Sequence, residues 1–191
     1  MIYKGVVKFV DTKLAVILIF LWAFAEALVF PLPPETLLIP LILVSQRRTL
    51  YFAVIALFGS FLGGIIAFSF GMAYPDLARS FIHSIFGLTT NMLSKVERWQ
   101  EQFGIISVLF SSFTGVPYKA FAFLGGVSKF NVFGFIAASL VARGSRILLL
   151  CFLANLVGRK CCKLIKSHFN LVILSYIMLV IILFILNQKL N

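Results

Sequence analysis

The chain has 191 residues, of which 61% are hydrophobic and 12% are charged. Its mean hydropathy of +1.07 lies far outside the range of soluble domains. We therefore expect an all-α, polytopic integral membrane protein. Because each crossing needs about 20 residues, the chain has room for a handful of helices in one domain and for no large soluble domain.

The net charge of +11 would indicate nucleic-acid binding in a soluble protein. In this chain, however, the basic residues stand at the ends of apolar runs, where they orient the chain, and no basic stripe is interleaved with aromatic residues. We expect no nucleic-acid partner, and we expect contact with anionic lipid headgroups instead. The distribution of basic residues places the N-terminal segment 1–13 in the cytoplasm.

The cysteines predict a reduced environment rather than a disulfide. Cys151, Cys161 and Cys162 lie at or beyond the end of an apolar run, in or near the basic segment GRKCCKLIK, and this position fits the cytosolic side. His168 alone is a weak metal ligand, so we expect no metal site and no cofactor.

Two apolar runs are interrupted by proline. The first extends from 14 to 44 and is broken by the sequence PLPPE at residues 31–35. It is too long for one helix and too short for two full crossings, which favours two half-helices that meet at the prolines as a re-entrant hairpin. The second run, 104–127, contains TGVPYKAFAFLGG and has the same character. Full crossings remain the alternative for both runs.

Each interrupted run is followed by a clean span, at 50–74 and at 132–157. In the first span, small residues that let another helix approach closely fall on two adjacent faces. One face carries Ser60, Gly64, Ala67 and Gly71, and the other carries the GxxxG pair Gly59 and Gly63. The GxxxG pair makes a homo-oligomer possible but is a weak dimer signal by itself.

The segment 75–103 is the long polar stretch of the chain, and its apolar residues recur at helical spacing. It predicts an amphipathic helix at the membrane interface. Residues 161–191 predict a basic loop and a plain C-terminal transmembrane helix at 169–186.

The hairpin and the span that follows it occur twice along the chain. A shift of about 83 residues places Pro34 on Pro117, and Gly59 then corresponds roughly to Gly144. A single span between the two hairpins would invert the second copy relative to the first. This is the architecture of many transporters with a binding site at the midplane.

The sequences EALVFPLPPETLL (26–38) and GVPYKAFAFLGGVSKFNVFGFIAASLVARGSR (115–146) resemble the DedA or VTT-domain family, closest to its YqaA-like branch. The resemblance extends over roughly residues 20–160. It implies a protein of the bacterial inner membrane that translocates lipids between leaflets, including polyprenyl phosphate carriers or phospholipids.

The resemblance also implies which residues matter. Glu26, Glu35, Arg143 and Arg146 match the family's key positions. Many relatives carry arginine after the second proline, where this chain has Tyr–Lys at 118–119. This departure leaves the identity of the lipid open.

The charged residues also make a physical case for an anion site. Lys119, Arg143 and Arg146 are donors suited to a phosphate, and Glu26 and Glu35 can neutralise them when the site is empty. We expect an anionic headgroup to enter this site while its tails stay in the bilayer, and we expect a glutamate to couple the cycle to protons. Prolines and glycines at the breaks and spans are expected to shape the backbone, namely Pro31, Pro33, Pro34, Pro117, Gly115, Gly125, Gly126 and Gly144.

Other interpretations remain open. In these, Glu26 is a purely structural partner of an arginine, Glu35 lies at the membrane interface, or Lys119 snorkels to the surface. The alternatives to lipid transport are transport of a soluble anion and a non-transporting assembly role. An enzyme is disfavoured, because no HExxH or Gly-x-Ser-x-Gly motif is present. A signal peptide at 1–25 is also disfavoured, because the apolar run continues past the cleavage site.

Overall fold

The computed structural model describes residue 6, residues 8–85, residues 88–160 and four isolated positions between 174 and 182. This part of the chain consists of helices and their connections and contains no strand, as expected. Apart from the four positions, the predicted helix at 169–186 lies outside the described residues, and Cys161 and Cys162 also lie outside them.

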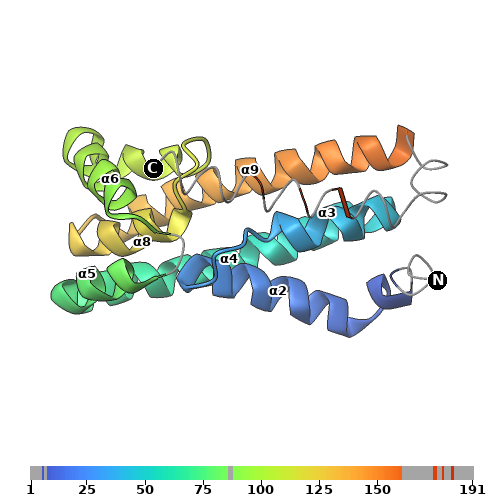
Figure 1. The fold of residues 1–191 in the computed structure, drawn as a ribbon, viewed down its shortest axis with the longest axis horizontal. Coiled ribbons are helices and arrows are strands. Elements are labelled where there is room, and N and C mark those ends of the chain that lie inside the picture. The colour runs from blue at the N-terminus through green and yellow to red at the C-terminus, as the bar shows by residue number, and fades with distance from the viewer. Residues whose placement is uncertain are drawn as a thin grey trace.

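The helices carry the labels of Figure 1. They are α2 (Lys13–Leu28), α3 (Glu35–Val44), η1 (Gln46–Arg48), α4 (Thr49–Ala73), α5 (Pro75–Ser84), α6 (Thr90–Phe103), η2 (Gly104–Ile106), α7 (Ser107–Phe110), α8 (Tyr118–Val127) and α9 (Val132–Lys160). The bundle is elongated: α2, α3, α4 and α9 lie along its length, and α5, α6 and α8 gather toward one end (Figure 1).

Among the residues that the structure describes, two helices are long and apolar enough to cross a membrane. The segment Gln46–Ala73 has 28 residues and the segment Val132–Gly158 has 27, and both exceed the about 20 residues that a crossing needs. The helices on either side of the first proline break are shorter, with 16 residues in α2 and 10 in α3. The break itself lies where PLPPE predicts it.

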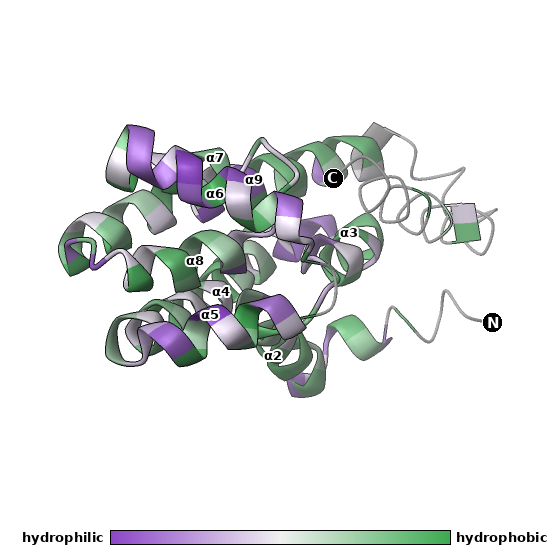
Figure 2. Cartoon of the chain, turned by 60° about the vertical axis from the view of Figure 1, so that its left-hand side comes forward, coloured by the Kyte–Doolittle hydropathy of each residue, from purple (hydrophilic) through white to green (hydrophobic). Residues whose placement is uncertain are grey.

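The predicted amphipathic helix at 75–103 is two helices rather than one. Pro75 occupies the first position of α5, where the missing amide donor costs nothing. The chain leaves helical geometry after Ser84, and Thr89 caps a new helix by accepting a hydrogen bond from the amide of Met92 at 3.3 Å. Figure 2 shows hydrophilic residues on the outer surfaces of α5 and α6, in agreement with the predicted amphipathic character.

The helix boundaries repeat along the chain with a constant offset. The ten-residue helices α3 and α8 begin at 35 and 118, directly after Pro34 and Pro117, and the long helices α4 and α9 begin at 49 and 132. Both pairs are offset by 83 residues, so the predicted shift is confirmed. The predicted correspondence of Gly59 and Gly144 is wrong, because this offset places Gly59 on Ala142.

The two long helices are antiparallel to each other. As residue numbers rise along α4, the numbers of the facing residues fall along α9 (Figure 1). The facing pairs are Gln46 with Gly158, Leu57 with Gly144, Ser60 with Arg143 and Phe68 with Phe135. The short helices cross over between the two halves, since α8 packs on α4 and α3 packs on α9.

Glycines allow these helices to approach closely. A Cβ atom added at Gly59 would lie 2.5 Å from the carbonyl oxygen of Phe20 in α2, and one added at Gly126 would lie 2.1 Å from that of Phe68 in α4. The predicted small-residue contacts are therefore confirmed. The GxxxG pair packs inside the chain, against α2.

The other predicted backbone residues differ in what they require. Gly115 has a φ of +70°, which favours glycine. At Gly125 and Gly144, by contrast, an added Cβ would meet its nearest neighbour at 3.5 Å and 3.9 Å, which is ordinary contact. A methyl side chain would therefore fit at both positions.

Candidate functional site

The centre of the bundle holds a buried ion pair between two distant parts of the chain. Glu26 lies in the last turn of α2 and Arg143 lies near the middle of α9, and the two residues are 6% and 3% exposed. The Arg143 guanidinium donates to the Glu26 carboxylate through Nη2. Breaking a buried pair of this kind by removing one partner costs about 3–5 kcal/mol, because the other charge is left without compensation.

Two further groups surround the Arg143 guanidinium. Its Nε donates to the hydroxyl of Ser60 at 2.6 Å, and its central carbon lies 4.8 Å from the centre of the Tyr118 ring. The Tyr118 hydroxyl donates in turn to Ser139 at 3.0 Å. Arg143 is therefore held by groups from α2, α4 and α8 at once.

A second ion pair lies one turn further along α9. The Nε atom of Arg146 lies 3.2 Å from Oε1 of Glu35, the first residue of α3. Glu35 is buried at 4% exposure, and its position at a helix N-terminus also favours its negative charge. The Arg146 side chain is 30% exposed, so this pair forms the edge of the cluster.

Lys119 connects the two proline breaks. It is 1% exposed, so the interpretation that it snorkels to the surface is wrong. Its ammonium donates to the carbonyl oxygens of Val29 and Phe30, both at 3.1 Å, in the break that follows α2. Within the described residues it forms no ion pair, although Glu26 is close enough to act on it electrostatically.

All five predicted site residues therefore belong to one charged cluster, defined here as Glu26, Glu35, Lys119, Arg143 and Arg146. The cluster carries three positive and two negative charges. It brings together residues from α2, α3, α8 and α9, and α4 contributes Ser60.

The cluster lies between two apolar cores. One core includes Phe68 and Phe135, and the other includes Ala23 and Ile147. Because Arg143 lies between Phe135 and Ile147 on α9, apolar packing encloses it from both ends of the bundle. Low polarity around the cluster strengthens each electrostatic contact within it.

Sequence reasoning missed two members of the site. Ser60 appeared only as a small residue on a packing face, and Tyr118 appeared only as a departure from a family pattern. No sequence signal marks either residue as a partner of an arginine more than twenty positions away.

The chemistry of the cluster suits the binding of an anion. Three cations converge on one region, and each carboxylate partner occupies donors that a phosphate could use instead. In the described part of the chain, no three His, Cys, Asp or Glu side chains are grouped so as to hold a metal ion.

Relatives of the chain match it over nearly its whole length. A protein of Haemophilus influenzae is 28% identical over 180 residues, which cover 94% of this chain and 93% of the relative. A protein of Histophilus somni is 25% identical over 183 residues, covering 96% and 95%. Both carry the description of uncharacterized proteins. No family model and no solved structure matches the chain.

Proposed function

We propose that this protein is an integral membrane lipid transporter of the DedA or VTT-domain type, which moves an anionic lipid between leaflets. The observation that carries the proposal is the charged cluster itself. Five ionisable residues from four helices converge near the middle of two helices that are long and apolar enough to cross a membrane. Charges at such a depth are costly, and a transport site is a common reason for keeping them.

The proposed topology has two inverted repeats. The offset of 83 residues between helix boundaries and the antiparallel arrangement of α4 and α9 support it. The short helices that flank each proline break fit re-entrant hairpins. The first break lies between helices of 16 and 10 residues and the second between helices of 4 and 10 residues, which are too few for two full crossings. In this topology the N-terminus is cytoplasmic.

The proposed cycle exchanges one anion for another. At rest, Glu26 and Glu35 neutralise Arg143 and Arg146. When the phosphate of a lipid headgroup enters, it takes over the arginine donors, and the displaced Glu26 takes up a proton. Lys119 supplies a further cation beside the same site. The partly exposed Arg146 is the contact at which the headgroup first binds, while the lipid tails stay in the bilayer.

A structural role is the competing function, and one observation favours it. Arg143 already has a carboxylate, a hydroxyl and an aromatic ring as partners. If the pair only locks α2 to α9, the protein is a non-transporting assembly factor.

Leaflet exchange in liposomes tests the proposal. The purified protein is reconstituted with a labelled phospholipid or a polyprenyl phosphate in one leaflet. Wild type is compared with the double variant E26Q/R143Q, which removes both charges and leaves no uncompensated partner. The exposed substitution R98Q, far from the cluster in α6, serves as the control. Circular dichroism and size-exclusion profiles establish that each variant is folded.

The proposal predicts exchange by wild type and R98Q and loss of exchange in the folded double variant. A folded double variant that exchanges lipid at the wild-type rate contradicts it. If folded wild type exchanges no lipid but takes up phosphate or chloride, the protein is a transporter of soluble anions. If it does neither, the assembly role is the better account.

A further inference from the structure

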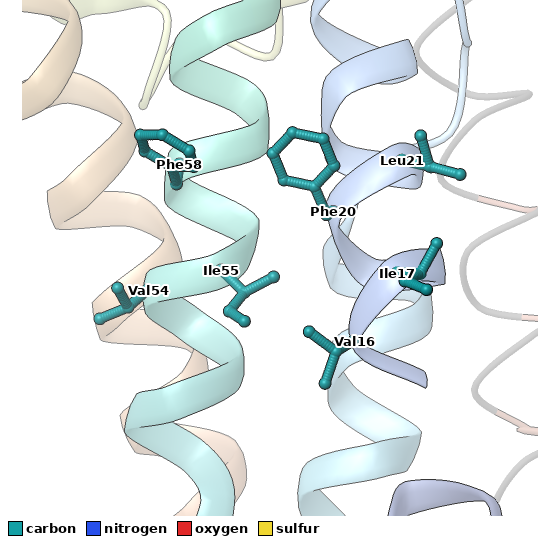
Figure 3. A pocket seen from close by; sticks show the side chains of 7 residues that line it. All are labelled: Val16, Ile17, Phe20, Leu21, Val54, Ile55 and Phe58. Carbon is teal, nitrogen blue, oxygen red and sulfur yellow. The ribbon is translucent and has the colours of Figure 1, made fainter. Parts of the chain in front are cut away.

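An apolar groove lies on the outside of the bundle between α2 and α4, away from the charged cluster. It has a volume of about 370 Å³. Figure 3 shows its lining residues, which are Val16, Ile17, Phe20, Leu21, Val54, Ile55 and Phe58. The rings of Phe20 and Phe58, 6.2 Å apart between centres and tilted by 39°, lie at one end of the groove.

A polar groove adjoins this one at Val16. Val16 lines both the apolar groove and a second groove of about 380 Å³, which also contacts Lys13 and Arg48. Tyr51 stands beside these cations and is 52% exposed. An amphipathic aromatic residue next to exposed cations is typical of the level at which lipid headgroups lie.

The polar groove has the charge that an anion requires. Asp11 pairs with Arg48 at 3.0 Å, but both side chains are largely accessible, at 66% and 40% exposure. Lys13 is exposed and has no ion pair among the described residues. The helices α2 and α4 are parallel and both begin here, so their positive ends lie side by side.

We infer that an anionic phospholipid binds across these two adjoining grooves, with its phosphate at Lys13 and Arg48 and one acyl chain between α2 and α4. From Lys13 to Phe20 is about 10 Å of helix, which accommodates roughly the first eight methylenes of a chain. The apolar part offers almost no polar surface, so it suits a hydrocarbon chain and not an extended peptide, whose backbone polar groups need partners.

This lipid is a resident one. Its site shares no residue with the charged cluster, so the inference goes beyond the proposed transport and does not depend on it. Asp11 competes with the phosphate for Arg48, which means that the bound lipid breaks the Asp11–Arg48 pair.

Native mass spectrometry of the purified full chain tests the inference. The protein is titrated with phosphatidylglycerol and, separately, with phosphatidylcholine of the same acyl chains. The variant V16F places a larger side chain where the two grooves adjoin, and V141F is its control, since Val141 is an exposed valine on α9. The variant R48Q removes a cation, and R98Q is its control. If V16F fails to fold, V54F replaces it, because Val54 is 52% exposed.

The expected result is a phosphatidylglycerol adduct that is preferred over phosphatidylcholine. R48Q weakens it about fivefold, as the loss of one cation near a headgroup does, and D11N strengthens it by a similar factor. V16F or V54F removes it, whereas V141F and R98Q leave it unchanged. Weakening by R48Q without any effect of V16F and V54F would mean headgroup contact alone and overturns the acyl-chain site.

Equal affinity for both lipids overturns the preference for an anionic headgroup, and unchanged adducts in R48Q overturn the placement of the phosphate at Arg48. The outcome is independent of transport. A chain that fails to exchange lipid but retains this adduct contradicts the proposed function and leaves the resident lipid in place. A chain that exchanges lipid but forms no adduct supports the proposed function and contradicts the resident lipid.

Discussion

Ser60 and Arg143 hydrogen-bond to each other and stand 83 residues apart, the same offset that relates α3 to α8 and α4 to α9. The two residues therefore occupy equivalent positions in the two halves of the chain and meet where the long helices cross. A pseudo-twofold axis that relates the two halves of the chain must therefore pass close to Ser60 and Arg143. The chemistry is not symmetric, because the first half supplies both carboxylates of the cluster and the second half supplies all three cations.

The Ser60 hydroxyl is expected to contribute to stability through this contact. Ser60→Ala removes one hydrogen bond to a buried charge and should lower the free energy of unfolding by about 1.5–3 kcal/mol. Thermal unfolding in detergent measures the change. Ser94→Ala is the control, because the Ser94 hydroxyl is exposed and bonds only within its own helix. Equal shifts for both variants would show that the Ser60 bond contributes nothing specific.

The Glu26–Arg143 pair is expected to show strong coupling. Arg143→Gln alone leaves the Glu26 carboxylate buried without its partner and should cost about 3–5 kcal/mol. The double variant E26Q/R143Q should cost less than the two single variants together. A double-mutant cycle on unfolding free energies gives the coupling. Additive effects would mean that the two charges do not stabilise each other.

Lys119 is expected to order the first proline break. Lys119→Met removes the donors to the carbonyls of Val29 and Phe30. Amide hydrogen exchange at Val29, Phe30 and Leu32, the non-proline residues of the break, should therefore become faster. Lys119→Arg keeps a cation and should have a smaller effect. If exchange in the break is unchanged in Lys119→Met, while the variant remains folded, the ammonium does not hold this segment.

The contact of α4 with α8 is expected to depend on one glycine of a neighbouring pair. Gly126→Ala places a Cβ atom 2.1 Å from the Phe68 carbonyl oxygen and forces the helices apart, whereas Gly125→Ala meets its nearest atom at 3.5 Å. We expect a loss of about 1–3 kcal/mol for the first variant and little change for the second. Parallel unfolding curves in detergent compare them, and a reversed order would contradict the packing argument.

Proton coupling is expected to reside in the two glutamates of the cluster. If a glutamate takes up a proton when the phosphate displaces it, Glu26→Gln or Glu35→Gln should abolish the pH dependence of leaflet exchange. Exchange is measured in liposomes between pH 5 and pH 8. If both variants keep the wild-type pH profile, transport is not coupled through these residues.

The proline breaks, the two long apolar helices and the spacing of the repeat could be predicted because each is a local property. Hydropathy, chain length and the missing amide of proline act within a few residues. The sequence also marked the five charged residues, because charge is costly in apolar surroundings wherever it occurs. The amphipathic stretch was predicted with one helix too few, although its sequence contains a helix-stop signal at Gly87 and a helix-start signal at Thr89.

By itself the sequence determined an all-helical chain with two apolar helices, two broken runs and charges in unfavourable surroundings. Only the tertiary structure decided the partners. Glu26 with Arg143, Arg146 with Glu35 and Lys119 with the backbone of the other break all connect distant segments. The reason is physical: burial penalises every unpaired charge alike, whereas the choice of partner depends on which helix faces approach, and this is set by packing at positions such as Gly59 and Gly126.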